Sequence, residues 1–156
     1  MKDINTLFES IKNKDTATLK AVLNANPKLA ESKDQRGFTA LILASYFDNE
    51  AATKILIEHN APINAKDASG NTALIGVSFK GNVGFAQYLI KNGADLNAIN
   101  ANGTTALTFA TQYNKVDIVK LLLEHNADTT VKDNDGKTAL DYAEAKEFTE
   151  IIGLLG

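Results

Sequence analysis

A short motif recurs along this chain at a constant spacing, and this repetition limits the fold more than any other feature. The motif is Gly-x-Thr-Ala-Leu, and it starts at Gly37, Gly70, Gly103 and Gly136, with 33 residues between successive starts. A fixed period of this length indicates stacked units, none of which can bury its apolar face alone. We therefore expect the 156 residues to form one elongated array whose core is shared between neighbouring units.

The residues around each motif glycine have the chemistry of a tight turn that leads into a helix. Each glycine ends a four-residue segment that begins with Asp or Asn, as in Asp34-Gln35-Arg36-Gly37. In a type I turn the Asx side chain bonds the backbone and the glycine takes a positive φ. Thr39 and its equivalents then stand immediately before an apolar run, where a hydroxyl can cap a helix.

Two stretches of helical periodicity follow each threonine. In the unit that begins at Gly103, apolar residues recur at helical spacing over 106–110 and over 116–123, with Asn114 and Lys115 between them. The second stretch ends at Asn60, Gly93 or Asn126 in successive units, and both residue types readily adopt the left-handed conformation. The expected fold class is all-α, with short β-hairpin turns between helix-turn-helix units.

This pattern resembles the ankyrin repeat in its 33-residue period, its turn followed by two helices and its Gly-x-Thr-Ala-Leu core. The ankyrin signature has Thr-Pro-Leu-His where this chain has Thr-Ala-Leu. The resemblance implies an ankyrin-repeat solenoid, with residues 1–156 as a single domain. Its expected units are an N-terminal capping repeat at 3–36, full repeats at 37–69, 70–102 and 103–135, and a shortened C-terminal capping repeat at 136–156. The stretch 26–30 carries one residue more than its counterparts.

Two departures from a regular array bear on its rigidity. The signature histidine is replaced by Ile42, Ile75, Thr108 and Asp141, so the Thr-to-His hydrogen bonds that brace ankyrin turns cannot form. Gly76 and Gly84 both fall inside predicted helices of the third repeat, and a helical glycine costs roughly 1 kcal/mol relative to alanine. We expect the third repeat to be the softest interior unit.

The composition argues against several classes of partner. Sixteen Lys and Arg against nineteen Asp and Glu give a net charge of −3, which lacks the basic excess that drives nucleic-acid binding. No apolar run approaches the roughly 18 residues of a membrane span. The first thirty residues carry charges where a signal peptide needs an apolar stretch. We expect no nucleic-acid or membrane partner, and a cytoplasmic location if Met1 is the natural start.

Side chains suited to catalysis or metal binding are scarce. The chain has no cysteine, which excludes disulfides, thiolate zinc sites and cysteine nucleophiles. His59 and His125 occupy equivalent places two repeats apart, so their backbones are expected roughly 20 Å apart, too far to share a metal ion. The segment 81–84 lacks the spacing of a phosphate-binding loop and predicts an inter-helix turn. We expect neither an enzyme nor a need for a cofactor or metal.

The resemblance implies a protein-binding module, because most ankyrin arrays bind partners through hairpin tips and the exposed ends of first helices, on a concave face. Exposed aromatic rings with an arginine nearby are typical of interface hot spots. Phe38, Tyr46 and Phe47 beside Arg36 form the leading candidate patch, and the alternative is that these rings pack on the neighbouring repeat. The candidate binding residues are Gln35, Arg36, Phe38, Tyr46, Phe47, Lys66, Asn71, Phe79, Lys80, Asn102, Thr104, Gln112, Tyr113 and Lys132.

The expected function is therefore non-catalytic binding of an unidentified partner protein by a monomeric scaffold. A small-molecule binder or an enzyme with a groove site stays open, and it would need perturbed titratable groups in a deep pocket. A structural protein that self-associates end to end also stays open, although polar capping repeats oppose it. The sixteen Asn residues, with many Lys and Ile, favour an AT-rich bacterial genome.

Overall fold

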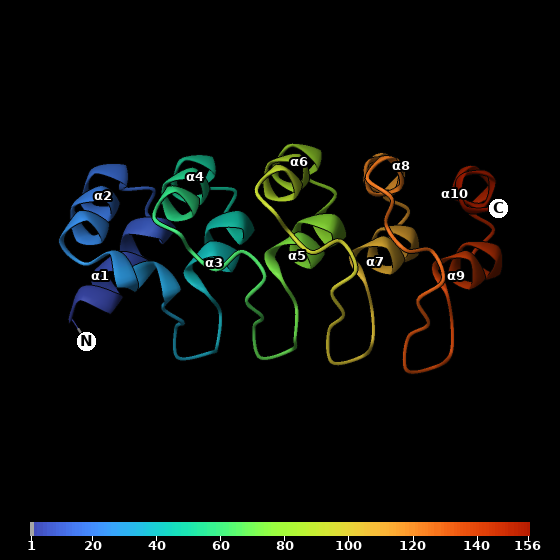
Figure 1. The fold of residues 1–156 in the computed structure, drawn as a ribbon, viewed down its shortest axis with the longest axis horizontal. Coiled ribbons are helices and arrows are strands. Elements are labelled where there is room, and N and C mark those ends of the chain that lie inside the picture. Colours follow the sequence, from blue (N-terminus) through green and yellow to red (C-terminus); the bar gives the residue numbers. More distant parts are fainter. Residues whose placement is uncertain (1) are drawn as a thin grey trace.

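The protein is a row of helix pairs, seen in a computed structural model that describes residues 2–156 (Figure 1). The first helices of the pairs are α1 (Lys2–Lys12), α3 (Ala40–Tyr46), α5 (Ala73–Lys80), α7 (Ala106–Gln112) and α9 (Ala139–Ala145). The second helices are α2 (Thr16–Ala25), α4 (Glu50–Glu58), α6 (Val83–Lys91), α8 (Val116–Glu124) and α10 (Thr149–Leu155). The expected all-α fold is confirmed.

One short element departs from the regular pairs. A 3₁₀ helix, η1 (Pro27–Glu31), follows α2, where the sequence carries its additional residue. The long connections between pairs project as loops to one side of the row (Figure 1). Each loop ends in a turn closed by a backbone hydrogen bond, such as the Asp67 N–H to the Asn71 carbonyl at 2.9 Å.

Threonine side chains start the last four first helices, as the sequence predicts. The hydroxyls of Thr39, Thr72, Thr105 and Thr138 each accept from the backbone N–H three residues later, at 3.0 to 3.2 Å. Two replacements of the signature histidine still reach this threonine. The Thr108 hydroxyl lies 3.2 Å from that of Thr105, and the Asp141 carboxylate accepts from the Thr138 N–H at 2.9 Å. The expected loss of bracing is therefore limited to the repeats that carry Ile42 and Ile75.

Left-handed residues end the helices where expected. Asn60, Gly93 and Asn126 have φ of 62°, 96° and 64° after the second helices. Gly81 has φ of 80° between α5 and α6, which confirms the predicted inter-helix turn.

The hairpin turns of the third, fourth and fifth repeats are joined to one another by backbone hydrogen bonds. The Ala101 N–H donates to the Ser69 carbonyl, and the Asn134 N–H donates to the Asn102 carbonyl, both at 3.0 Å. Gly70 lies at this contact with φ of 79°, and a Cβ there would come within 2.8 Å of the Ala101 nitrogen. Glycine at position 70 is thus required both by its conformation and by the close approach of the next turn.

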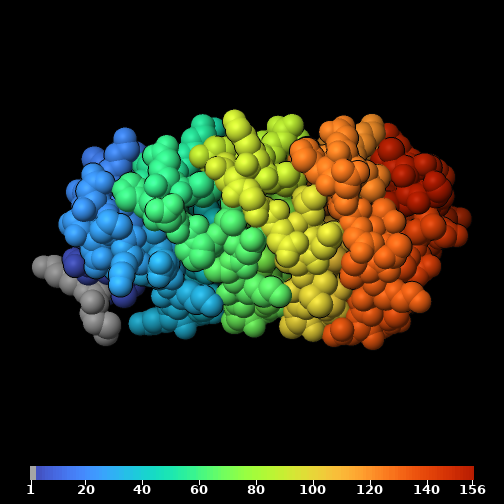
Figure 2. Space-filling model, in the orientation of Figure 1, coloured from blue at the N-terminus to red at the C-terminus, as the bar shows by residue number. Residues whose placement is uncertain are grey.

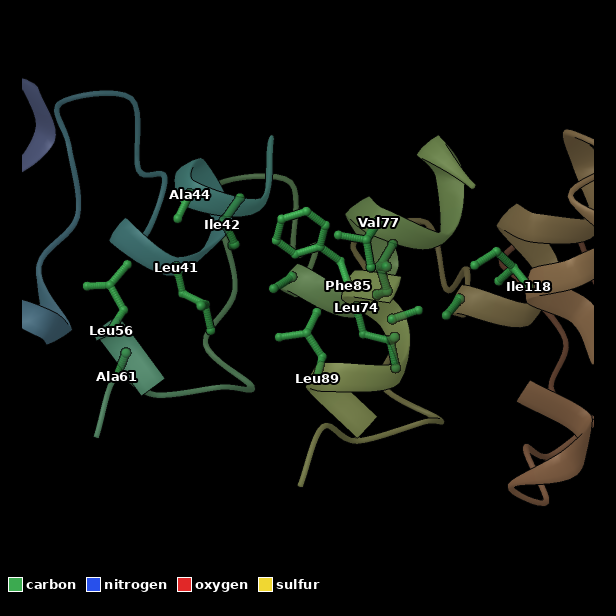
Figure 3. Packing of buried hydrophobic residues seen from close by; sticks show 14 of the residues in the cluster. Leu41, Ile42, Ala44, Leu56, Ala61, Leu74, Val77, Phe85, Leu89 and Ile118 are labelled. Atoms are coloured by element: carbon green, nitrogen blue, oxygen red, sulfur yellow. The ribbon is translucent and has the colours of Figure 1, made fainter. Parts of the chain in front are cut away.

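The core is shared between neighbouring pairs. Leu41, Leu74 and Leu107 of the first helices, and Leu56 and Leu89 of the second helices, are at most 1% exposed. Figure 3 shows Leu41, Leu56, Leu74 and Leu89 among the side chains that fill the space between helices. Burial of one such side chain contributes about 1.5–3 kcal/mol. Figure 2 shows the consequence, since each pair covers the side of the next and the surface continues along the row.

Candidate functional site

Most of the predicted binding residues lie on one surface, formed by the hairpin turns and the adjoining ends of α3, α5 and α7. We call this surface the hairpin-helix face. Its exposed members are Gln35, Arg36, Tyr46, Lys66, Phe79, Lys80, Asn102, Tyr113 and Lys132, and its half-buried members are Phe38, Phe47, Asn71 and Gln112.

Thr104 does not belong to this face, so the prediction for this residue is wrong. It is 6% exposed, because it sits inside the hairpin turn rather than at its tip. Its backbone N–H donates to Asn100 Oδ1 and its carbonyl accepts from the Asn100 N–H. Thr104 therefore offers almost no surface to a partner.

Three aromatic side chains stand out from the face in consecutive repeats. Tyr46, Phe79 and Tyr113 are 63%, 44% and 50% exposed. Phe79 meets Tyr113 edge-on with ring centroids 4.5 Å apart, and it lies 6.1 Å from the ring of Phe109. Phe109 is half-buried and joins this surface cluster.

The leading candidate patch is divided between two hollows. Phe38 and Tyr46 border a pocket shared with α5, whereas Phe47 borders a wider hollow shared with α1. Phe38 and Phe47 are half-buried against the core, so the alternative that these rings pack on neighbouring repeats applies to both. The Arg36 guanidinium lies 4.9 Å from the Phe38 ring centroid and covers it further. Of the three rings in the patch, Tyr46 is the one that stands exposed.

The pocket between α3 and α5 has a volume of about 200 Å³ and lies within the hairpin-helix face. Its walls are formed mainly by Phe38, Ile42, Tyr46, Gly76 and Phe79, and Asp67 lies at its hairpin side. We call it the Gly76 pocket. From the sequence, Gly76 is expected only to weaken its helix, and Asp67 is not among the candidate binding residues. The signal that could have found the pocket is the lack of a side chain where equivalent positions carry large ones.

Two lysines predicted to contact a partner also brace neighbouring repeats. Lys80 Nζ donates to the Tyr46 carbonyl at 2.7 Å and pairs with Asp48 at 3.2 Å. Lys66 Nζ donates to the Ile99 carbonyl at 2.7 Å. Because both ammonium groups already have backbone partners in an adjacent repeat, a docking protein would have to share them or displace them.

The carboxylates with shifted pKa values on this face support turns. Burial alone would raise the pKa of Asp34, but hydrogen bonds from the Phe38 N–H and from Arg36 outweigh it and lower the pKa. Burial likewise opposes the lowered pKa of Asp133, which accepts from the Tyr142 hydroxyl and from two backbone N–H groups. The hydrogen bond to Asp133 raises the pKa of Tyr142 to about 12. Asp34 and Asp133 lie in separate turns and do not converge on one pocket.

The two histidines are held at the C-terminal ends of second helices. His59 Nδ1 lies 2.8 Å from the Ile55 carbonyl, and its Nε2 lies 3.1 Å from Asn24 Oδ1 of the preceding repeat. His125 Nδ1 lies 3.0 Å from the Leu121 carbonyl. Among residues 2–156, no three His, Asp or Glu side chains gather closely enough to hold a metal ion. Nor does any helix in this range have the length and apolar character needed to cross a membrane.

Comparison with known proteins identifies the repeat seen in the sequence and the helix pairs. A family model described as ankyrin repeats, in three copies, matches residues 7–100 and again residues 77–156. The two matches together reach from the middle of α1 to the end of the chain. A search of curated proteins finds no match.

Proposed function

Because the chain belongs to the ankyrin-repeat family, we propose that it is a non-catalytic module that binds a partner protein through the hairpin-helix face. Ankyrin repeats are generally protein-protein interaction modules. Membership of a fold family supports this class of function but does not identify the partner. The residues that would carry the binding are those of the hairpin-helix face, with Tyr46, Phe79 and Tyr113 as its anchors.

The exposure of these three rings on one face is the observation that carries the proposal. Each of these three residues is between 44% and 63% exposed. Large apolar rings gain nothing from exposure, whereas interface hot spots are rich in Tyr and cluster in the middle of a contact surface. Three anchors from consecutive repeats fit a partner that lies along the row.

A groove enzyme or small-molecule binder is less well supported. The Gly76 pocket, at about 200 Å³, falls below the roughly 300–1,000 Å³ of ordinary ligand sites. Asp34 and Asp133, whose pKa values are shifted, lie in two different turns and are held by turn hydrogen bonds. Catalysis by acid and base groups needs such carboxylates to meet around one substrate.

End-to-end assembly is opposed by the polar surface of the last pair. Asp141, Glu144, Glu147 and Glu150 are all exposed there, and stacking another chain on this end would desolvate their charges. We therefore propose a monomer. Sedimentation that stays independent of protein concentration would agree with this, and concentration-dependent growth would contradict it.

Affinity capture with matched variants tests the binding face. The variant Tyr46→Ser/Phe79→Ser/Tyr113→Ser removes the three exposed rings, and Lys54→Ser/Gln87→Ser/Lys120→Ser changes exposed residues of the second helices as a control. Since a hot-spot residue contributes about 2 kcal/mol or more, the triple aromatic variant should bind its partner at least about 100-fold more weakly. Circular dichroism checks that both variants fold. A partner that is kept by the aromatic variant and lost by the control would place the binding face elsewhere.

A further inference from the structure

The position of Gly76 carries a large side chain in the other three motif-bearing repeats. Leu43, Gly76, Phe109 and Tyr142 are spaced 33 residues apart, so they occupy equivalent places in α3, α5, α7 and α9. A Cβ on Gly76 would meet no neighbouring group within 4 Å among residues 2–156. The space left open is the Gly76 pocket, and its 200 Å³ exceeds the roughly 150 Å³ of an apolar cavity that takes up benzene.

The fifth repeat shows what can occupy this place. There Tyr142 donates its hydroxyl hydrogen to Asp133 Oδ2 in the hairpin turn nine residues earlier. Asp67 and Gly76 are also nine residues apart, and both border the Gly76 pocket. The third repeat therefore keeps the acceptor of this arrangement and lacks the phenol.

Asp67 also lacks the partner that its equivalents have. Its Oδ1 accepts from the Ser69 and Asn71 N–H groups at 2.9 Å, which closes the turn. Asp34 Oδ2 is bound by Arg36 at 3.0 Å, and Asp133 Oδ2 is bound by Tyr142. Within the described part of the chain, Asp67 Oδ2 makes no hydrogen bond or ion pair, because Ser69 and Gly76 stand where those donors would be.

The other groups around the pocket favour an aromatic occupant with a donor at its tip. Phe38, Ile42 and Phe79 supply apolar walls. Lys80, the cation at the rim, is already bound to the Tyr46 carbonyl and to Asp48. One carboxylate oxygen of Asp67 at the pocket thus has no partner within the described residues, and its complement is a hydrogen-bond donor carried on a flat apolar ring.

We propose that the Gly76 pocket receives a tyrosine side chain of the partner protein, whose hydroxyl donates a hydrogen bond to Asp67 Oδ2. This proposal rests on the proposed function, since it names the residue that the hairpin-helix face recognises. The partner's tyrosine completes in the third repeat the contact that Tyr142 makes within the fifth.

Three short peptides serve as probes, namely N-acetylated, C-amidated Gly-Tyr-Gly, Gly-Phe-Gly and Gly-Arg-Gly. Each is titrated into the full ¹⁵N-labelled chain while the backbone amide signals are followed. The tyrosine peptide should shift the Asn71 and Gly76 signals with a dissociation constant on the order of millimolar, as suits a small ligand. It should bind about fivefold more tightly than the phenylalanine peptide, because only tyrosine can donate to Asp67.

Variants separate the pocket from its acceptor. Gly76→Tyr fills the pocket with a phenol of the chain itself and should abolish binding of the peptide. Gly76→Phe, which copies Phe109, is a second blocking variant in case the first does not fold. Asp67→Asn keeps the turn, since Asn100 closes the equivalent turn through its Oδ1. It should reduce the preference for tyrosine over phenylalanine, because a neutral amide replaces the charged carboxylate acceptor. Gly84→Ala, on α6, is the control that leaves binding unchanged.

Several results would overturn the proposal. The tyrosine peptide could leave the pocket signals unmoved up to its solubility limit, or the arginine peptide could bind more tightly. Undiminished binding to folded Gly76→Tyr or Gly76→Phe would place the peptide elsewhere. The pocket proposal can be wrong while the proposed function is right. In that case the variant Tyr46→Ser/Phe79→Ser/Tyr113→Ser loses the partner protein, whereas the Gly76 variants keep it.

Discussion

The third and fourth repeats share the same core and differ in their faces. Leu74 and Leu107 are each 1% exposed at equivalent places. Two residues further along, the fourth repeat carries Phe109 against Phe79, whereas the third carries Gly76 and leaves a pocket. Buried helix positions therefore hold the row of helix pairs together. A position on the hairpin-helix face can change from phenylalanine to glycine without altering how the pairs stack.

The largest expected effect tests whether the two cores are equivalent. Leu74→Ala and Leu107→Ala should each lower the free energy of unfolding by about 3 kcal/mol, through lost burial and the cavity left behind. Urea denaturation of the two variants checks this. Losses that differ by more than about 1 kcal/mol would mean that Gly76 weakens the core beneath it as well as the face.

A second expectation concerns local opening of the third repeat. Gly76 lies inside α5, and its conformational freedom in the unfolded chain costs about 1 kcal/mol relative to alanine. Amides of α5 and α6 should exchange hydrogen several-fold faster than those of α7 and α8. A Cβ at position 76 meets no neighbour in the described structure. Gly76→Ala should therefore bring the exchange rates of the two repeats closer together and raise the free energy of unfolding by up to about 1 kcal/mol. Equal exchange in the two repeats of the wild type would contradict the comparison.

The fold could be predicted from the sequence because its signals are local. The threonine caps, the turn glycines and the left-handed Asn60 and Asn126 each act on residues within one or two turns of themselves. The period then placed every unit beside its neighbour. The order of first and second helices in the motif-bearing repeats followed from these features together.

The site could be predicted only in outline because its details depend on contacts between repeats. Whether Phe38 and Phe47 are exposed is decided by the adjoining repeat on either side. Lys66 and Lys80 look like free surface charges until their contacts with neighbouring carbonyls are seen. The Gly76 pocket requires both the missing side chain and the walls supplied by α3.

A third expectation compares two equivalent buried serines. The Ser45 hydroxyl lies 3.2 Å and 2.8 Å from the Leu41 and Ile42 carbonyls, whereas the buried Ser78 hydroxyl has no partner within the described residues. Ser45→Ala should lose about 1 kcal/mol, and Ser78→Ala should be neutral or stabilising, because it removes an unsatisfied group. Thermal unfolding of both variants measures these stability changes. An equal loss of stability in the two would show that the Ser78 hydroxyl has a hydrogen-bond partner in solution.

The smallest expected effect concerns the phenol that fills the equivalent position in the fifth repeat. Its hydrogen bond to Asp133, followed by burial, raises the pKa of Tyr142 to about 12 from 10.0. Because the pKa of Tyr142 is higher in the folded state than in the unfolded chain, the phenol contributes its full stability to the folded protein below pH 10.0. This contribution is lost as the pH rises from 10.0 toward about 12. The stability of Tyr142→Phe should therefore fall less steeply over this range than that of the wild type. Parallel unfolding curves would mean that the phenol does not hold Asp133.

The central claim, that this chain binds a partner through the hairpin-helix face, is tested most directly by hydrogen exchange with and without the captured partner. In the presence of the partner, slower exchange should be confined to the hairpin turns and first helices, over residues 34–47, 67–80 and 100–113. Helices α4, α6 and α8 should exchange as in the free protein. Slower exchange in α4, α6 and α8, with exchange on the hairpin-helix face unchanged, would contradict binding through that face.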